Sequence, residues 1–355
     1  MKRLKSVIIS LLLTCAAYAQ EVVWNVDFDV RLDNHEFAKM DIGRSKTLFG
    51  LYLAPTVGFG WDENIHSLNV GADLQTSFGL VGDEPYTGSL LAYYKLDAPK
   101  HKVYAGVFPV GDMFDDFTTA FVSDEMRFND RSLEGVAYVY RARRGYVKLI
   151  FDMPRWSRDY MSEILTLYSS SKWTFGGFSM GYLFDLNHYA YGIDRGLIVD
   201  NYWLNPFVEY SFGKYISLQK GIINIGGIVT AQRDRTVTNE LIFPMGGQAR
   251  LSVQKWNVGL DNTFYFGDNL MPYAGYVDLY HGSEMYMTQT GVYNRLECYF
   301  DAYTTDFMDV SVSWIMHTDG VGIGWQQKAK VSIALDSGKW NSMIKQKKHS
   351  KYETK

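Results

Sequence analysis

Polar and apolar residues alternate with a period of two in several segments of this chain. The segment 24–33 reads W-N-V-D-F-D-V-R-L-D, so every second side chain is apolar. The same alternation returns at 67–78, 248–254, 309–317 and 328–333. Because successive side chains of a β-strand point to opposite faces, these segments are predicted to be strands with one apolar and one polar face.

The complete pattern predicts about sixteen strands, and fourteen to eighteen fit it, because such patterns locate strand ends only to within about two to four residues. The predicted strands are 22–33, 46–60, 66–79, 87–96, 102–110, 133–142, 145–153, 162–169, 173–186, 200–211, 221–232, 245–254, 256–267, 291–302, 307–317 and 324–335.

Long and short connections alternate between these strands. The connections after odd-numbered strands are mostly long: 34–45, 80–86, 111–132, 154–161, 187–199, 233–244 and 268–290. Those after even-numbered strands are mostly tight, as at 61–65, 143–144, 255 and 303–306. This asymmetry is typical of a bacterial membrane barrel with a periplasmic N-terminus, whereas a soluble β-sandwich has no reason to show it. We therefore expect an all-β fold, a transmembrane antiparallel β-barrel.

The composition supports a membrane barrel. Aromatic residues make up 16% of the chain, beside 32 Gly and only 8 Pro, yet the mean hydropathy is only −0.17. No stretch after residue 20 approaches the roughly 18 consecutive apolar residues of a transmembrane helix. A barrel explains this combination, because only alternate residues face lipid and aromatic girdles mark both interfaces. The net charge of −4 indicates no partner, and nothing points to nucleic acid.

The first residues have the three parts of a secretory signal: three early cations, an apolar run over 7–13, and Ala17-Tyr18-Ala19. Cleavage is expected after Ala19. Cys15 allows a lipoprotein reading, but Thr14 is larger than the small residue that usually precedes a lipidated cysteine. The predicted organisation is a signal peptide at 1–19, a barrel at 20–340 and a basic tail at 341–355. With Cys298 alone after the signal, no internal disulfide can form.

A barrel of sixteen strands is too wide for side chains alone to fill, so it encloses an aqueous channel unless a loop plugs it. The polar faces near the C-terminus would line this lumen with charges of both signs. The candidate pore-lining residues are Arg250, Arg295, Glu297, Asp301, His317, Lys328 and Lys330. The alternative is that these groups pair across neighbouring strands and only stiffen the wall.

The connection 111–132 combines carboxylates with phenylalanines. Its candidate constriction residues are Asp112, Asp115, Asp116, Asp124 and Glu125, interleaved with Phe114, Phe117, Phe121 and Phe128. Folded into the lumen, such a loop would narrow the pore and favour cations, and its rings could stack on sugars. The alternative is a solvated extracellular loop. The acidic spacing does not match an EF-hand, so neither a metal nor another cofactor is expected.

An outer-membrane hydrolase is the competing hypothesis. Gly177-Phe178-Ser179-Met180-Gly181 matches G-x-S-x-G, and His281 is the most plausible base. In hydrolases this motif marks a sharp strand-to-helix turn, whereas here it falls inside a predicted strand with no helix after it. We therefore expect no enzymatic activity.

Two smaller features remain. Arg141, Arg143 and Arg144 fall at a predicted periplasmic turn, where they contact anionic headgroups or are simply solvated. Cys298 lies on the apolar phase of its strand and is expected to face lipid.

Two stretches resemble a largely uncharacterised family of porin-like outer-membrane β-barrels of Bacteroidetes. The matching residues are Gly106–Pro109, Phe121–Phe128 and Leu133–Gly135 in the first stretch, and Gly267–Tyr273, Asp278–Gly282, Tyr293–Arg295 and Gly324–Gln327 in the second. The motifs are loose and cover most of the chain after the signal. They imply a location and a barrel form, but no substrate and no catalytic residues. Unlike many such barrels, the chain continues past Trp340 into a lysine-rich tail.

Together these observations predict an outer-membrane, porin-like channel through which small polar solutes diffuse passively. Its expected partners are outer-membrane lipid, the barrel-assembly machinery and the solutes, and the sequence does not decide between a monomer and a homo-oligomer. A plugged barrel that binds a ligand or serves a structural role is the main alternative.

Overall fold

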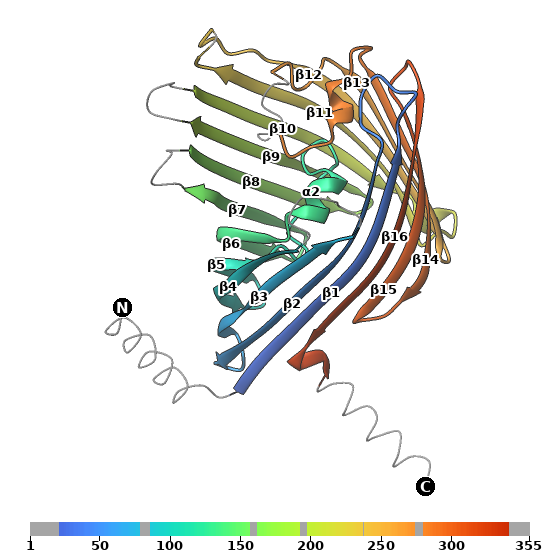
Figure 1. Cartoon of the computed structure of the whole chain (residues 1–355). Helices are drawn as coiled ribbons and strands as arrows, with labels where there is room; N and C mark the ends of the chain where they lie inside the picture. The colour runs from blue at the N-terminus through green and yellow to red at the C-terminus, as the bar shows by residue number, and fades with distance from the viewer. Residues whose placement is uncertain are drawn as a thin grey trace.

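The computed structural model describes residues 21–78, 86–156, 162–191, 197–236, 238–273 and 280–340. Most of this part of the chain is β-strand, in sixteen strands (Figure 1). They are β1 (Glu21–Glu36), β2 (Lys46–Trp61), β3 (His66–Ser77), β4 (Tyr86–Asp97), β5 (His101–Pro109), β6 (Ser132–Ala142), β7 (Gly145–Trp156), β8 (Ser162–Phe175), β9 (Phe178–Tyr191), β10 (Leu197–Ser211), β11 (Lys220–Asp234), β12 (Met245–Lys255), β13 (Val258–Gly267), β14 (Val292–Thr304), β15 (Met308–Thr318) and β16 (Ile323–Asp336).

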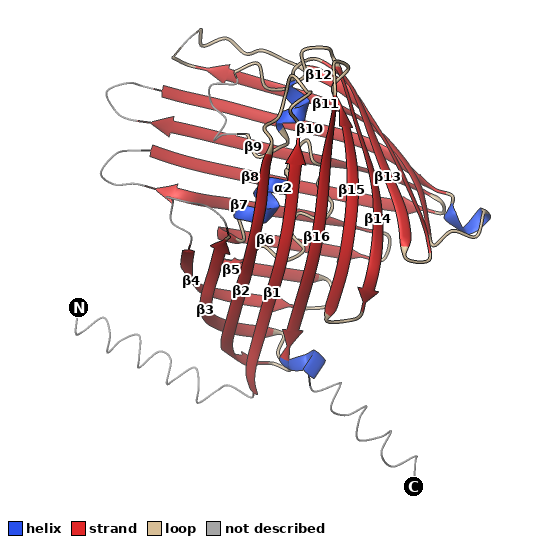
Figure 2. Cartoon of the chain, turned by 45° about the vertical axis from the view of Figure 1, so that its right-hand side comes forward, coloured by secondary structure: helices blue, strands red, loops and turns tan. Residues whose placement is uncertain are grey.

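The strands form one closed antiparallel barrel. Each strand pairs with its neighbours in the sequence, and β1 closes the ring by pairing with β16, with Val30 opposite Val331 (Figure 2). Closure leaves no strand edge with unpaired N–H and C=O groups, which hydrocarbon could not satisfy. The predicted fold class and the count of sixteen strands are confirmed.

The outer wall of the barrel is apolar and its interior is polar, the reverse of a soluble protein. Val57, Leu90, Val208 and Trp314 are exposed on the outside. Strand residues of the opposite phase, such as Asn69, Lys148 and Gln326, are buried within the ring. Exposed apolar surface on this scale marks a surface that contacts lipid. Cys298 is exposed, as expected for its outward phase.

Long connections gather at one end of the barrel, the loop side, and mostly short turns at the other, the turn side, where β1 begins and β16 ends (Figure 1). Connections at 37–45, 110–131, 235–244 and 268–291 contrast with turns at 62–65, 98–100, 143–144 and 305–307. Among the connections that lie wholly within the described residues, two depart from this pattern: the turn-side connection 212–219 carries a 3-10 helix (Gly213–Tyr215), and the loop-side connection 319–322 is short. In the part of the chain that the structure describes, no helix is long and apolar enough to cross a membrane.

Two predicted connections are misplaced. The predicted long connection 187–199 is mostly strand, because β9 continues to Tyr191 and β10 begins at Leu197. The sequence also predicted strands at 162–169 and 173–186, joined by a turn at 170–172 within a serine-rich run. Instead β8 continues to Phe175, the turn is Gly176-Gly177, and β9 begins at Phe178. The serines stay in the strand because every hydroxyl has a partner there. Ser170, on the lumen phase, donates to Asp116 of the inward loop, whereas Ser169 and Ser171, on the outward phase, donate to the carbonyls of Lys148 and Tyr146 on β7. A polar run that suggests a turn in a soluble protein is here part of a barrel strand.

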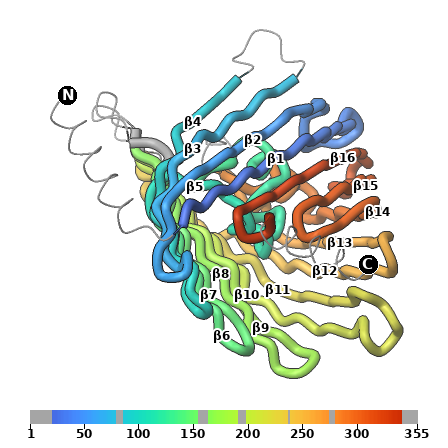
Figure 3. Tube along the Cα trace, turned by 90° about the horizontal axis from the view of Figure 1, so that it is seen from below, coloured from blue at the N-terminus to red at the C-terminus, as the bar shows by residue number. Residues whose placement is uncertain are grey.

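Part of the lumen is filled by the loop 110–131, which carries the short helix α2 (Asp124–Asn129). Seen from below, the teal segment containing α2 lies between β5 and β16 (Figure 3). Its apolar residues pack with wall and loop residues into a core inside the barrel; members include Phe114, Phe117, Phe121, Tyr168, Trp203, Leu270, Tyr280 and Tyr286. The proposed signal (1–19), the tail (341–355) and Asp278 of the second resemblance stretch lie outside the described residues.

Candidate functional site

Helix α2 begins at a capped N-terminus inside the barrel. The Ser123 hydroxyl accepts a hydrogen bond from the backbone N–H of Met126 at 3.0 Å, as an N-cap residue does. Asp124 and Glu125 occupy the first turn, where the helix dipole favours negative charge. Arg127 donates to the carbonyl oxygens of Phe114 and Phe117, so it holds the preceding loop against the helix.

Asp124 fastens α2 to the opposite wall of the barrel. Its carboxylate lies 3.3 Å from the Arg295 guanidinium on β14 and 3.2 Å from the Lys328 ammonium on β16. Glu297 shares both cations, at 2.7 Å from Arg295 and 3.6 Å from Lys328. Burial raises the pKa of Asp124, but Lys328, Arg295 and Arg127 outweigh it and hold that pKa far below its usual range. Asp124 therefore stays charged at any physiological pH.

A second anchor joins the end of the loop to β1. Arg131 forms an ion pair with Asp29, and Asp29 also lies 2.9 Å from Arg31. Both arginines donate to the backbone carbonyl of Arg127. These residues were not among the predicted site residues. The polar face of the strand 22–33, which carries Asp27, Asp29 and Arg31, was the sequence feature that could have identified them.

A third anchor joins the start of the loop to β7 and β8. The carboxylate of Asp116 lies 2.7 Å from the Lys148 ammonium and accepts hydrogen bonds from the hydroxyls of Tyr146 and Ser170. Lys148 also donates to the carbonyl of Met113 at 2.7 Å. Two anchors in one sector of the wall, on β14, β16 and β1, and a third on β7 and β8 thus fix the loop across the lumen.

A second loop covers the first. The backbone N–H of Ser123 donates to the carbonyl of His281, and that of Ser283 donates to the carbonyl of Thr119. Gly282 permits this approach, because a Cβ atom there would collide with the backbone oxygen of Ala120. Tyr280 stacks on Trp203 with ring centroids 4.9 Å apart. The residues 280–291 therefore complete the plug in this half of the barrel.

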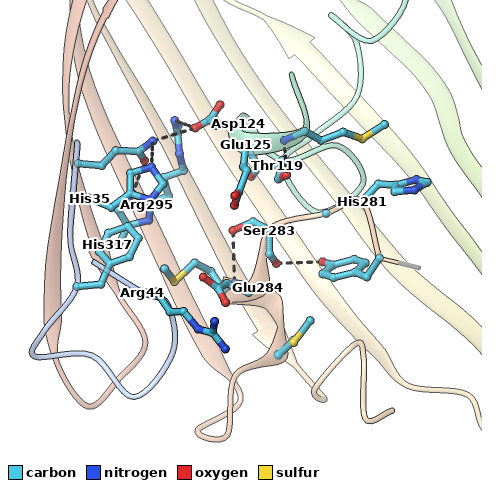
Figure 4. Close-up of a pocket in the computed structure, with 18 of the residues that line it drawn as sticks. His35, Arg44, Thr119, Asp124, Glu125, His281, Ser283, Glu284, Arg295 and His317 are labelled. Atoms are coloured by element: carbon cyan, nitrogen blue, oxygen red, sulfur yellow. Dashed lines mark hydrogen bonds and ion pairs between the residues drawn. The ribbon is translucent and has the colours of Figure 1, made fainter. Parts of the chain in front are cut away.

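Among the cavities in the rest of the lumen, two meet at Asp124. The loop-side chamber, about 560 Å³, is bounded by the ends of β1, β14, β15 and β16 and by both inward loops. Figure 4 shows His35, His317 and Arg295 on one wall, facing Glu125 and Ser283. The turn-side chamber, about 750 Å³, lies beneath α2 and is lined by β1, β13, β14, β15 and β16. Asp124 lines both chambers, so its ion-pair cluster stands at the narrowing between them.

Carboxylates outnumber cations in the turn-side chamber. Among its described lining residues there are ten carboxylates and six cationic groups. Asp29, Asp124, Asp261 and Glu297 form ion pairs. In the described part of the chain the remaining lining carboxylates have no ion pair to Lys or Arg; these are Asp27, Asp33, Asp112, Asp115, Asp301 and Asp309. The net negative charge of this lining attracts cations.

The predicted residues divide into three groups. Asp124 is brought together with Arg295, Glu297 and Lys328 at the narrowing. Asp112, Asp115, Asp301 and Lys330 line the turn-side chamber, and His317 lines the loop-side chamber. The others form local pairs: Arg250 with Asp261 on the next strand at 3.3 Å, Glu125 with Lys46, and Asp116 with Lys148.

The named residues of the hydrolase hypothesis do not assemble a catalytic pair. Ser179 lies within β9, and its hydroxyl is 2.9 Å from the Thr174 hydroxyl on β8. His281 lies on the second loop with its Nδ1 atom 2.5 Å from the Tyr168 hydroxyl. A serine nucleophile needs a base within hydrogen-bond reach. Among the described residues, no group of three or more His, Cys, Asp or Glu side chains is arranged to hold a metal ion.

Acidification is expected to loosen the second loop through His281. Burial lowers the pKa of His281 to about 4, against about 6.5 for a free histidine. The undocked loop therefore binds the proton more readily, so docking is strongest above about pH 6.5 and weakens as the pH falls towards 4. Hydrogen-exchange protection of the amides at 280–287, corrected for intrinsic rates, should fall over this range.

The matched control is His281→Phe, which removes the titrating group and keeps a ring. Its protection at 280–287 should lose most of the pH dependence. Asp130, on the first loop, contributes a pH dependence of the opposite sign to that of His281. Burial and nearby Asp73 raise the pKa of Asp130 to about 6. A wild-type profile that is flat between pH 7 and 4, or a variant profile with the same slope, would contradict the assignment to His281.

Comparison with known proteins supports the fold. No family model and no curated protein sequence matches this chain. Among solved structures, OpdK of Pseudomonas aeruginosa with vanillate aligns at 11% identity and a TM-score of 0.51, covering 90% of this chain and 100% of that one.

Two further barrels align to a similar extent. A loop-deletion mutant of OmpT, an outer membrane protein of Vibrio cholerae, aligns at 12% identity and a TM-score of 0.53, covering 89% of this chain and 99% of that one. The high-pH structure of OprB of Pseudomonas putida aligns at 9% identity and a TM-score of 0.50, covering 91% and 96%. The chain thus has the fold of outer-membrane β-barrels.

Proposed function

We propose that this chain is an outer-membrane channel for passive diffusion of small polar solutes, narrowed by the loop 110–131. The observation that carries the proposal is the pair of cavities stacked along the lumen and meeting at Asp124. Each has the volume of a site for a small organic molecule. The loop 110–131 and α2 form the constriction, and the charged groups around them select the solutes.

Purified protein in a planar lipid bilayer tests this proposal. Discrete, stable conductance steps are expected, and their reversal potential in a salt gradient should indicate cation preference, given the surplus of carboxylates in the turn-side chamber. Proteoliposomes should also swell in a small sugar and not in a large oligosaccharide. Protein that shows a barrel circular dichroism spectrum but gives neither steps nor swelling would overturn the proposal.

A plugged barrel that binds a ligand is the second candidate function. The aromatic core built from Phe121, Trp203 and Tyr280 fills one part of the lumen, and Asp124 is held on both sides by ion pairs. Such a barrel would bind a ligand saturably in the loop-side chamber without conducting ions. The bilayer measurement therefore separates the two candidates.

The proposal also covers the family, the export and assembly, and the oligomeric state of the chain. Kinship to the porin-like barrels of Bacteroidetes is supported by the matched stretches, such as Gly267–Tyr273. Export by the segment 1–19, insertion by the barrel-assembly machinery and absence of enzymatic activity belong with it. A homo-oligomer is compatible with the barrel, and cross-linking in native membranes would measure its size.

A further inference from the structure

A third cavity opens beside the turn-side chamber and has a different charge. This side chamber, about 840 Å³, lies beneath the start of the loop 110–131, against the turn-side ends of β5 to β8. Asp112 and Asp115 line both it and the turn-side chamber, so the two cavities adjoin. Its remaining charged lining residues are Lys102, Asp116, Arg141, Arg143, Arg144, Lys148 and Lys172.

Most cations of the side chamber have no counter-ion in the protein. Lys148 is neutralised by Asp116 at 2.7 Å, and Lys172 by Glu209 at 2.5 Å. Within the described ranges, Lys102, Arg141, Arg143 and Arg144 form no ion pair and donate no side-chain hydrogen bond to the protein. Asp112 and Asp115 are the only other charged groups of the lining, so positive charge is in excess. The three arginines are exposed to solvent, so their guanidinium groups are free to bind an anion that enters the cavity, and their shared positive charge attracts one.

The chamber is shaped for an organic anion rather than for a bare ion. Guanidinium groups bind carboxylate and phosphate oxygens through paired N–H donors, and three of the four unpaired cations are arginines. Met113, Val139 and Ala142 supply an apolar wall beside them, and Tyr146 supplies a ring. The register supports this placement, because Arg141 and Arg144 share the phase of lumen-facing residues such as Val139 and Lys148, both buried.

We propose that the side chamber binds a small organic anion that carries carboxylate or phosphate groups. The arginines for which the sequence allowed headgroup contact or simple solvation thus form an anion site at the turn-side mouth of the lumen. The proposal deepens the proposed channel function by naming a class of solute, and it rests on that function only for transport. An anion held here would lie beside the acidic turn-side chamber, close to the periplasmic opening.

Calorimetric titration of the full-length protein in detergent at low ionic strength tests binding independently of conductance. The probes are succinate, glucose 6-phosphate and, as a neutral control, glucose. The test variant is Arg141→Gln/Arg143→Gln/Arg144→Gln. The matched control is Lys214→Gln/Lys255→Gln, which removes two cations near turn-side connections outside the chamber. Lys102→Gln on β5 is a second test variant if the triple variant does not form a barrel.

At least one anion should bind the wild type and the matched control equally. The triple variant should bind it at least about tenfold more weakly, since each charged hydrogen bond contributes that much, and added salt should weaken binding further. Which anion binds separates carboxylate from phosphate. Equal binding by the triple variant, equal binding of glucose, or no binding of either anion would overturn the proposal. Absence of conductance steps with intact binding would instead remove the channel function alone.

Discussion

Replacing Asp124 with alanine is expected to raise the single-channel conductance severalfold. The carboxylate neutralises Arg295 and Lys328 on the wall and lies near Arg127 in its own helix. Removing one partner of a fully buried ion pair costs about 3–5 kcal/mol, and the cost here is smaller, because Glu297 still neutralises part of the charge on Arg295 and Lys328. The loss falls on the contact between α2 and the wall, so α2 should leave the lumen while the strand ladders keep the barrel closed. Bilayer recordings measure the conductance, and hydrogen exchange of the amides at 124–129 measures release of the helix.

Glu125→Ala is the matched control. It removes a carboxylate from the next position in the same turn of α2. Glu125 and its partner Lys46 are both substantially exposed to solvent. An exposed pair contributes only about 0–1 kcal/mol. This variant should therefore keep the wild-type conductance and helix protection. If Asp124→Ala conducts like the wild type, or if Glu125→Ala raises the conductance equally, the ion pairs of Asp124 do not hold α2 in the lumen.

The strand ladder could be predicted from the sequence because a membrane barrel imposes one rule on every strand. A side chain of one phase faces lipid and a side chain of the other faces the lumen, so alternation marks strands even at modest hydropathy. The prediction failed where local composition gave a misleading signal, at the serine run before Gly176-Gly177 and in the predicted connection 187–199. In the serine run the inward loop and the carbonyls of β7 replace water as the partners of the hydroxyls.

The site was only partly predictable for the same reason. Alternation shows that Arg295, Glu297 and Lys328 point inward, but it cannot show which loop meets them. That contact depends on how the loop 110–131 folds, which is decided by packing of Phe117 and Phe121 across the lumen. The acidic and aromatic composition of the loop allowed an inward fold and a solvated extracellular loop alike. The anchors to Asp29 and Lys148 follow only from the three-dimensional arrangement.

Phe121→Ala is expected to release the inward loops without unfolding the barrel. Phe121 is 1% exposed and packs edge-to-face on Trp203, with ring centroids 5.8 Å apart. Truncating a buried phenylalanine to alanine costs about 3–5 kcal/mol, through lost burial and the cavity left behind. That loss falls on the core that joins both loops to the wall, whereas every strand keeps its ladder. Hydrogen exchange should therefore rise at 112–128 and 280–287 and remain unchanged in β1 to β16.

Phe178→Ala is the control for this substitution, because it removes the same side chain from a position that is 59% exposed. It should leave exchange in both loops unchanged. The two loops should also loosen together in Phe121→Ala, since Ser123 and Ser283 bond each loop to the backbone of the other. If the strands exchange as fast as the loops, Phe121 supports the barrel itself. If neither loop changes, the ion-pair anchors alone hold the constriction, and the aromatic core only fills space.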